Sequence, residues 1–297
     1  MHELCKELNL NLFKKPKDYY YVKIYSMEDQ IILIDKPENI SSFGVVAKVR
    51  AKLRDKFGHK IKVGHTGTLD PFATGLLILL SGKMTKKSND FLKLDKEYIA
   101  TLKLGFTSTT GDPEGEITEM PFLEHGEVFP PEKPSDSPDF YNISPLKNPT
   151  SFSEIKDFSE AEHVVKMTPR EYYLRSKKGI SMISSVLESF VGTITQTPPK
   201  FSAIKINGQR AYKLARKNQD FEIPSRQVKI YSIDILQYHY PELTIKVHCS
   251  SGTYIRTLAE DIGKALNTGA YLTALRRTKI GTYNIKDATP LSDYMLQ

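Results

Sequence analysis

Residues 64–82 read GHTGTLDPFATGLLILLSG. The second half of this stretch is an uninterrupted apolar run, Leu76–Leu80, which is typical of a strand buried on both faces. The first half contains three glycines, a histidine and one acidic residue, Asp70. Glycines allow positive φ and close approach of the backbone, so such a loop can wrap an anion or a nucleotide. The stretch therefore predicts a buried strand preceded by a loop that presents Asp70.

Asp70 is followed by Pro71, which favours extended backbone at Asp70 and removes one backbone donor. This context allows two interpretations. The carboxylate either carries chemistry or caps the turn that follows it. Spacing alone favours the capping turn, and a single histidine such as His65 is likewise more often structural than catalytic.

Outward from this stretch, strands and helices interleave without a regular βαβ alternation. Apolar spacing and turn signals predict helices over 41–57, 180–190, 210–217 and 253–266. They predict strands over 30–35, 98–104, 227–235, 242–249 and 279–285. This pattern indicates an α+β fold with a mixed, mostly antiparallel sheet flanked by helices.

The composition changes after Met120. Seven of the 17 prolines fall within 121–149, among acidic residues and few aliphatic ones. Such a stretch cannot bury enough apolar surface to offset its ordering entropy. We therefore expect a basic leader over 1–25 and one folded domain over 26–290, interrupted at about 121–160 by a partly disordered insertion.

Charge and cysteine content limit the class of protein. The formal charge of +7 and the pI near 9.1 favour a polyanionic partner, although excess lysine can also serve solubility alone. Cys5 and Cys249 form no metal-binding or disulfide pattern. No apolar run is long enough to cross a bilayer. We expect a soluble intracellular protein with no membrane partner and no metal, in the nucleus, the cytoplasm or the mitochondrion.

Other enzyme classes lack their motifs here. Residues 81–83 (SGK) do not have the glycine spacing of a Walker A loop, and no HExxH, GxSxG or kinase pattern occurs. Any chemistry must therefore use carboxylate, hydroxyl and guanidinium groups.

Six segments in a fixed order resemble the TruB family of pseudouridine synthases. GHTGTLDPFATG (64–75) resembles the catalytic motif of that family. The others are DKPENISSF (35–43), KEYIATLKLG (96–105), FSAIKINGQRAYKLAR (201–216), CSSGTYIRTLAEDIG (249–263) and LTALRRTKIG (272–281). The resemblance covers most of the chain from about 30 to 285 and implies the pseudouridine synthase fold with a central catalytic cleft.

The resemblance assigns three catalytic residues. Asp70 would be the essential carboxylate, Tyr98 would stack on the target base, and Arg256 would pair with Asp70. Because a nearby guanidinium favours the charged form of a carboxylate, we expect a lowered pKa and an anionic Asp70.

It also implies substrate-binding residues. Tyr254 and Leu275 would line the pocket, and His65 would touch RNA near the space that the base leaves. Lys36 stands with these residues or, together with Pro37, supports the catalytic loop. Basic segments at 83–87 (KMTKK) and 276–279 (RRTK) are candidates for phosphate contacts.

The implied reaction converts the uridine at position 55 of the tRNA T-loop to pseudouridine. It involves no redox step and no external group, so no cofactor is expected. The resemblance implies the T-stem-loop of tRNA as partner, with T-loop-like sites in other structured RNAs as further targets, and a monomeric enzyme. Asp70 could stabilise positive charge at C1′, attack covalently, or remove the C2′ proton, and the sequence leaves these routes open.

Two departures and two alternatives remain. The chain ends at ATPLSDYMLQ, without the C-terminal PUA domain of many bacterial members, and its insertion resembles those of eukaryotic stand-alone members. One alternative is the guide-RNA-dependent branch, although Thr66, Phe72 and Ala73 differ from its usual motif. The other is an RNA chaperone or tRNA-folding module.

Overall fold

The computed structural model describes residues 27–120, 174–175, 177–206, 208–217 and 219–297, together with the backbone of residues 10–14 and 20–24. The expected insertion at 121–160 lies outside the described residues, as does most of the leader. The two described segments of the leader form an antiparallel hairpin of β1 (Leu10–Lys14) and β2 (Tyr20–Ile24).

One ten-stranded sheet forms the centre of the molecule. Its strands are β3 (Ile31–Lys36), β4 (Val63–His65), β5 (Thr74–Ser81), β6 (Lys96–Leu104), β9 (Gly192–Gln196), β12 (Arg226–His239), β13 (Glu242–Cys249), β14 (Ala270–Ile280), β15 (Tyr283–Asn284) and β16 (Thr289–Pro290). They follow the order β16-β3-β5-β14-β6-β13-β12-β9, with β4 beside β5 and β15 beside β14. Among these described strands, β14–β5 and β16–β3 pair in parallel and the other pairs are antiparallel. The predicted mixed, mostly antiparallel sheet is confirmed.

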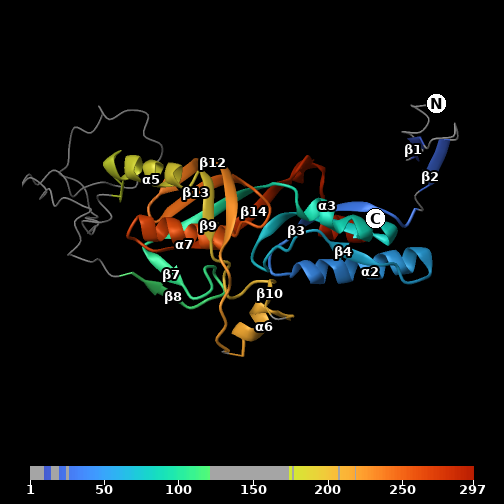
Figure 1. Ribbon diagram of the computed structural model, residues 1–297, viewed down its shortest axis with the longest axis horizontal. Helices are drawn as coiled ribbons and strands as arrows, with labels where there is room; N and C mark the ends of the chain where they lie inside the picture. Colours follow the sequence, from blue (N-terminus) through green and yellow to red (C-terminus); the bar gives the residue numbers. More distant parts are fainter. Residues whose placement is uncertain are drawn as a thin grey trace, which may run out of the picture.

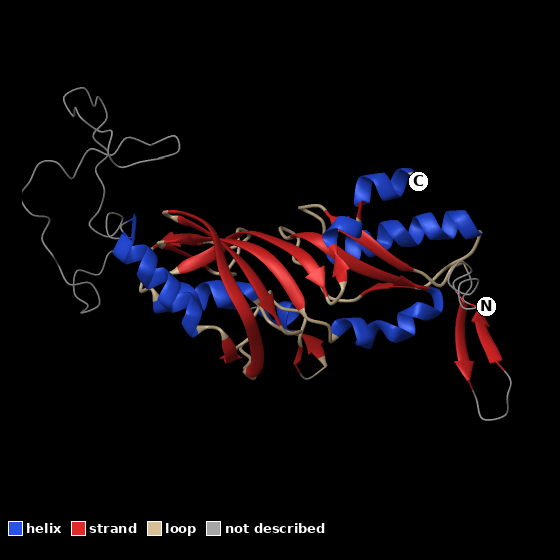
Figure 2. Ribbon diagram, turned by 90° about the horizontal axis from the view of Figure 1, so that it is seen from above, coloured by secondary structure: helices blue, strands red, loops and turns tan. Residues whose placement is uncertain are grey.

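Helices lie on both sides of this sheet (Figures 1 and 2). They are α2 (Ser42–Phe57), α3 (Ser88–Leu92), α5 (Lys177–Ser189), α6 (Ala211–Ala215), α7 (Ile255–Ala265) and α8 (Leu291–Leu296), with 3-10 turns at η1 (Gly82–Lys87) and η3 (Ile285–Asp287). Short hairpins of β7 (Phe106–Ser108) with β8 (Ile117–Glu119) and of β10 (Lys205–Ile206) with β11 (Gln209–Arg210) complete the described elements.

Strand β5 is buried on both faces, as its apolar run predicts. Leu77 and Leu79 pack with the apolar side of α2 in one core. Leu76 and Ile78 pack with Phe91 of α3 in a second core on the opposite face. Because alternate residues of a strand point to opposite faces, a continuous apolar run is what two cores require.

A third and larger core fills the other half of the sheet. It joins the inner faces of β6, β13 and β14 to α7 and α5. Helix α7 contributes Ile255, Leu258 and Ile262 at helical spacing. Two residues of the 66–73 loop, Leu69 and Ala73, also belong to this core. Strand β5 itself packs in the first two cores, whereas the loop that precedes it also packs in this third core, through Leu69 and Ala73.

Several predicted boundaries are confirmed and one is wrong. The helix predicted over 41–57 is α2, and its N-cap is Ser41, whose hydroxyl accepts a hydrogen bond from Gly44 N. The strand predicted over 279–285 is instead β14, which runs from Ala270 to Ile280 and is followed by the two-residue β15. The arginines and lysine of this segment conceal the strand, since Arg276 and Lys279 pair with acidic residues distant in sequence and Arg277 donates to distant backbone carbonyls.

Among the described residues, no helix combines the length and the apolar character that crossing a membrane requires.

Candidate active site

The loop that carries Asp70 connects β4 to β5 and is held at its middle by the N-terminus of α2. The buried hydroxyl of Ser42 donates to Leu69 O (2.9 Å) and accepts from Leu69 N (2.8 Å). One residue beyond Asp70, Pro71 O accepts from Lys36 Nζ (3.1 Å) and from Asn39 N (2.9 Å). Both neighbours of Asp70 are thus fixed by the segment 36–42, and the position of the carboxylate follows from them.

The structure places Lys36 as a support of this loop. Its side chain is fully buried, and Nζ donates to three backbone carbonyls, those of Pro37, Ile40 and Pro71. Burial lowers the pKa of Lys36 to about 8. An ammonium with three donors has none left for RNA. These contacts favour the expected supporting role of Lys36 over the alternative of substrate binding.

Arg256 brings the site together from the first turn of α7. Its Nε lies 3.1 Å from Asp70 Oδ2, as the family resemblance implies. The guanidinium is 5% exposed and also donates to Asp112 Oδ2 (3.0 Å), Thr110 O (3.1 Å) and Phe201 O (2.8 Å). A buried guanidinium with this many acceptors is held in one orientation. Asp70 Oδ1, in contrast, accepts no hydrogen bond from the described residues and remains available.

Asp112 is the site residue that sequence reasoning missed. It is buried at 3% exposure and lies 144 residues from Arg256 in sequence. Its Oδ1 accepts from the Thr110 hydroxyl and from Glu114 N (3.1 Å). The preceding Gly111 has φ +73°, and a Cβ there would collide with the carboxylate of Glu260 on α7. The segment 110–116, TGDPEGE, carries a turn signal, but only the fold shows that the turn faces Arg256.

The pKa of Asp70 moves in the direction opposite to our expectation. Burial raises the pKa of this carboxyl, and the charge of Asp112 adds to the effect, while Arg256, Lys36 and Arg277 oppose it. The expected lowering by Arg256 is therefore outweighed by desolvation. A poorly solvated carboxylate is well suited to stabilise positive charge that develops beside it.

Tyr98 and Leu275 form an apolar wall next to the loop. Both are 8% exposed and both belong to the core cluster that contains Leu69 and Ala73. They lie on the adjacent strands β6 and β14, where Leu275 pairs with Ala100. Burial raises the pKa of the Tyr98 hydroxyl, so this group is neutral at physiological pH. The structure thus brings these two predicted residues to the catalytic loop.

Tyr254 precedes α7 and lies two residues before Arg256. Its backbone is fixed by the buried side chain of Gln196, which accepts from Tyr254 N (3.1 Å) and donates to Tyr254 O (3.3 Å). The guanidinium of Arg226 lies 4.8 Å from the centre of the Tyr254 ring. These two supports were not foreseen, because Gln196 and Arg226 carry no motif of their own.

His65 ends β4 at the start of the same loop. Its Nδ1 accepts from Gly67 N at 3.4 Å. Burial and the charges of Arg277 and Arg210 lower the pKa of His65. The imidazole is therefore neutral at physiological pH and would meet RNA as a hydrogen-bonding group without charge.

The two basic segments differ in what they can offer to phosphates. Lys83, Lys86 and Lys87 are exposed on η1. In the segment 276–279, Arg277 is buried at 1% exposure and Lys279 pairs with Glu97 at 3.1 Å. The expected phosphate contacts of RRTK are therefore wrong for Arg277, since it cannot reach RNA.

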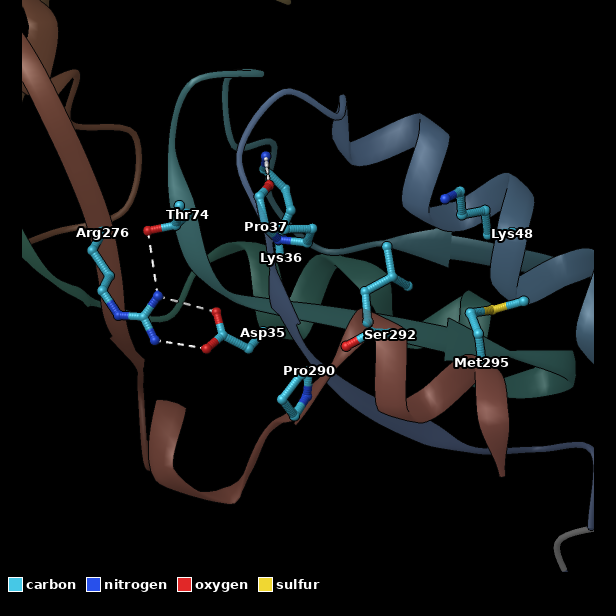
Figure 3. A pocket seen from close by; sticks show the side chains of 10 residues that line it. Asp35, Lys36, Pro37, Lys48, Thr74, Arg276, Pro290, Ser292 and Met295 are labelled. Carbon is cyan, nitrogen blue, oxygen red and sulfur yellow. Dashed lines mark hydrogen bonds and ion pairs between the residues drawn. The ribbon is translucent and has the colours of Figure 1, made fainter.

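A separate pocket of about 500 Å³ lies between β3, α2, β16 and α8 (Figure 3). Arg276 reaches its wall and holds the Asp35 carboxylate with both Nη atoms (2.6 and 3.2 Å). Arg276 also donates to the Thr74 hydroxyl (3.3 Å), where β5 begins. Asp70, Tyr98 and Arg256 do not line this pocket.

The fold is shared with chains in two solved structures of complexes. The chain matches a Cbf5-Nop10-Gar1 complex with a TM-score of 0.54 and 24% identity, over 90% of this chain and 54% of that one. It matches the archaeal box H/ACA sRNP Nop10-Cbf5 complex with a TM-score of 0.51 and 22% identity, over 91% of this chain and 53% of that one. These two likenesses show the shared fold.

Sequence comparison gives the family. The model described as "TruB family pseudouridylate synthase (N terminal domain)" matches residues 54–130 and 151–255. The model described as "tRNA pseudouridylate synthase B C-terminal domain" matches residues 256–295. The chain belongs to the TruB family of pseudouridine synthases.

Curated relatives are similar over most of their length. The tRNA pseudouridine synthase B of Phocaeicola vulgatus is 38% identical over 90% of this chain and 92% of its own. That of Parabacteroides distasonis is 40% identical over 85% and 86%, and that of Flavobacterium johnsoniae is 38% identical over 90% and 94%. These relatives are bacterial and give no support to the eukaryotic-type assignment or to a nuclear or mitochondrial location.

Proposed function

We propose that this enzyme converts the uridine at position 55 of the tRNA T-loop to pseudouridine without a guide RNA. The observation that carries the proposal is the chain of contacts Asp70–Arg256–Asp112, formed beside the apolar wall of Tyr98 and Leu275. The names of the bacterial relatives supply the substrate class, tRNA. The position within tRNA comes from the resemblance of the motif around Asp70.

The target base must leave its stack to reach Asp70. Extruding a nucleotide costs a few kcal/mol. Stacking on an aromatic side chain returns about 1–3 kcal/mol per base. Tyr98 and Tyr254 are the aromatic residues that the family resemblance assigns to this stacking, and both are held by the packing described above. His65 lies at the start of the loop. According to the resemblance, its neutral imidazole contacts the RNA near the space that the extruded base leaves.

The chemistry then requires cleavage of the N1–C1′ bond, rotation of the base, bonding of C5 to C1′ and loss of the C5 proton. Cleavage develops positive charge at C1′, as in glycoside hydrolysis, and a fixed carboxylate stabilises it. Asp70 presents its free oxygen Oδ1 for this task, while Arg256 holds Oδ2. The same oxygen could attack covalently or accept the C2′ proton, and these routes share the requirement for an ionised Asp70.

The test uses a T-stem-loop transcript with tritium at C5 of its uridines. Release of tritium without added guide RNA supports a stand-alone enzyme. Release that depends on a guide RNA would favour the guide-dependent branch. Binding of the transcript without release would favour an RNA chaperone or a tRNA-folding module.

Asp70→Asn identifies the catalytic group. We expect this variant to fold and to bind the transcript with nearly unchanged affinity, while turnover falls by at least about 100-fold. An amide of the same size keeps the contact with Arg256 but cannot carry the negative charge. Retained turnover would contradict the assignment of Asp70.

We further propose that the enzyme acts as a monomer and accepts T-loop-like sites in other structured RNAs.

A further inference from the structure

Arg277 is the largest of the fully buried side chains of the described residues, at 1% exposure. A buried guanidinium is costly unless its donors and its charge find partners. Its neighbour in sequence, Arg276, points to the other side of the sheet and is satisfied by Asp35 and Thr74 (Figure 3). The partners of Arg277 therefore indicate what its burial serves.

The first partners are the two ends of the catalytic loop. Arg277 Nε donates to Leu76 O (2.8 Å), just after the loop, and Nη2 donates to Gly67 O (3.1 Å), just before its tip. A Cβ built on Gly67 would lie 3.5 Å from Nη1. One planar group thus fixes the distance between two carbonyls that enclose Asp70, which a flexible ammonium cannot do.

The backbone of Arg277 is in equally close contact with the loop. Gly75 has φ +102°, and a Cβ at that position would lie under 3.0 Å from the backbone N of Arg277. The parallel pairing of β14 with β5 ends at Arg277 and Gly75. The loop therefore enters strand β5 beside Arg277, whose side chain also holds the loop.

The third partner is Tyr98. In the antiparallel pair β14–β6, Arg277 is the direct cross-strand neighbour of Tyr98, so both side chains lie on the same face of the sheet. The Arg277 guanidinium is also close enough to Tyr98 to oppose the rise that burial causes in the pKa of the Tyr98 hydroxyl. The charge of Arg277 also acts on Asp70. The Arg277 side chain therefore lies against both the loop that carries Asp70 and the Tyr98 ring that would stack on the base.

We propose that Arg277 is a positioning residue that sets the distance between the Asp70 carboxylate and the Tyr98 ring. The proposal rests on the function proposed for Asp70 and Tyr98. Arg277 itself touches no RNA. It would act by holding the loop 67–76 and strand β6 in one register, so its loss should affect the chemical step more than the binding of RNA.

The experiment compares Arg277→Lys and Arg277→Gln with Arg54→Lys, a control at an exposed arginine of α2 that pairs with Asp55. Each variant is tested for folding by circular dichroism and thermal unfolding, for affinity to the T-stem-loop, and for single-turnover rate as a function of pH. Wild-type enzyme must release tritium from the same transcript. If it does not, the proposed function fails and the role of Arg277 in it falls with it.

We expect Arg277→Lys to bind the transcript like wild type but to react about 100-fold more slowly, since a displacement near 1 Å at a reacting group has an effect of this size. Because lysine keeps the charge, the acid limb of its pH profile should stay in place. Arg277→Gln should show a similar loss, and its acid limb should move to higher pH, because a charge that favours ionised Asp70 is gone. Arg54→Lys should stay within about twofold of wild type.

Three results would overturn the proposal. The first is a wild-type rate in Arg277→Lys. The second is a loss that appears in RNA affinity and thermal stability with an unchanged rate for the bound complex. The third is failure of both Arg277 variants to fold, which would make the residue part of the core alone. If only Arg277→Lys fails to fold, Arg277→Gln decides by its rate and acid limb.

Discussion

Asp70 and Arg256 lie 3.1 Å apart, yet the effect of burial on the carboxylate exceeds that of the guanidinium. Arg256 is shared, because it also holds Asp112 at 3.0 Å. One positive charge between two carboxylates cannot fully stabilise both. The Asp70 carboxylate is therefore fixed in position, while Arg256 compensates only part of its negative charge. This state suits the proposed task of stabilising a cationic sugar.

The pH dependence of activity should reflect this state. The proposed mechanism requires an ionised Asp70, so the rate should rise with pH through the pKa of Asp70 and reach a plateau above it. Since that pKa is raised above 3.8, the acid limb should lie at higher pH than for an ordinary aspartate. Single-turnover rates between pH 4 and 8, in steps of about half a unit, would locate the limb.

His65 provides the control for that measurement. Its pKa is lowered from 6.5 by burial and by the charges of Arg277 and Arg210, so it is another group of this loop whose titration could produce an acid limb, whereas we assign the limb to Asp70. His65→Asn should therefore leave the acid limb where it is, even if the overall rate falls. An acid limb that disappears in this variant would assign the limb to His65 and contradict its assignment to Asp70.

Asp112→Asn should slow the chemical step by about 10- to 100-fold, because the guanidinium of Arg256 loses the charged acceptor that orients it. The sign of the accompanying pH change is fixed as well. Asp112 raises the pKa of Asp70, so its removal should move the acid limb to lower pH. Asp261→Asn, on the same helix α7 and paired with Lys264, serves as the control and should leave both quantities unchanged. An acid limb of Asp112→Asn at higher pH would contradict this account.

At the scale of elements, the N-terminus of α2 has two adjacent serines with different tasks. Ser41 caps the helix itself, by accepting from Gly44 N. Ser42 lies inside the first turn, and its hydroxyl takes both the N–H and the carbonyl of Leu69. Helix α2 is therefore connected directly to the residue before Asp70, although 27 residues separate them.

Ser42→Ala should consequently reduce both stability and rate. It leaves a buried donor and a buried acceptor of Leu69 unpaired, which costs roughly 1–3 kcal/mol in the free energy of unfolding. Ser41→Ala should cost about 1 kcal/mol through the lost helix cap, with the rate of the bound complex unchanged. Urea unfolding combined with single-turnover rates separates the two effects. Equal rates in both variants would show that Ser42 does not control the loop.

At the scale of the whole molecule, the site lies where the cores meet. Strand β5 belongs to the two cores at one end of the sheet, whereas Leu69 and Ala73 of the loop belong to the large core at the other end. Arg256 and Asp112 come from that second half as well. One continuous sheet of ten strands connects the two halves and fixes the distance between the loop and these residues (Figure 2).

The insertion should be dispensable for this arrangement. Deletion of residues 122–158 should leave tritium release from a T-stem-loop close to that of the full chain. On either side, the body is already anchored, by the bond from Met120 N to Gly105 O (2.8 Å) and by the fully buried Leu174. The family model also leaves residues 131–150 unmatched. A deletion variant that cannot fold would show that the boundaries of the insertion are wrong.

The sequence by itself determined the local features. The apolar run of β5, the cap at Ser41 and the family motifs around Asp70, Tyr98 and Arg256 are properties of neighbouring residues, and periodicity or motif reveals them. The mixed sheet followed from the order of these segments. Of the residues that the resemblance supplied, Arg256 pairs with Asp70, Tyr98 and Leu275 share a core with Leu69, and Lys36 supports the loop.

Only the tertiary structure decided how charge is buried. It places Asp112 on Arg256 and turns Arg277 inward from a segment that looks like a phosphate-binding run. It also reverses the expected direction of the Asp70 pKa shift. The physical reason is that desolvation and pairing depend on groups brought together from positions up to about 200 residues apart. No local pattern records such partners, so the energetics of the site appear only once the chain is folded.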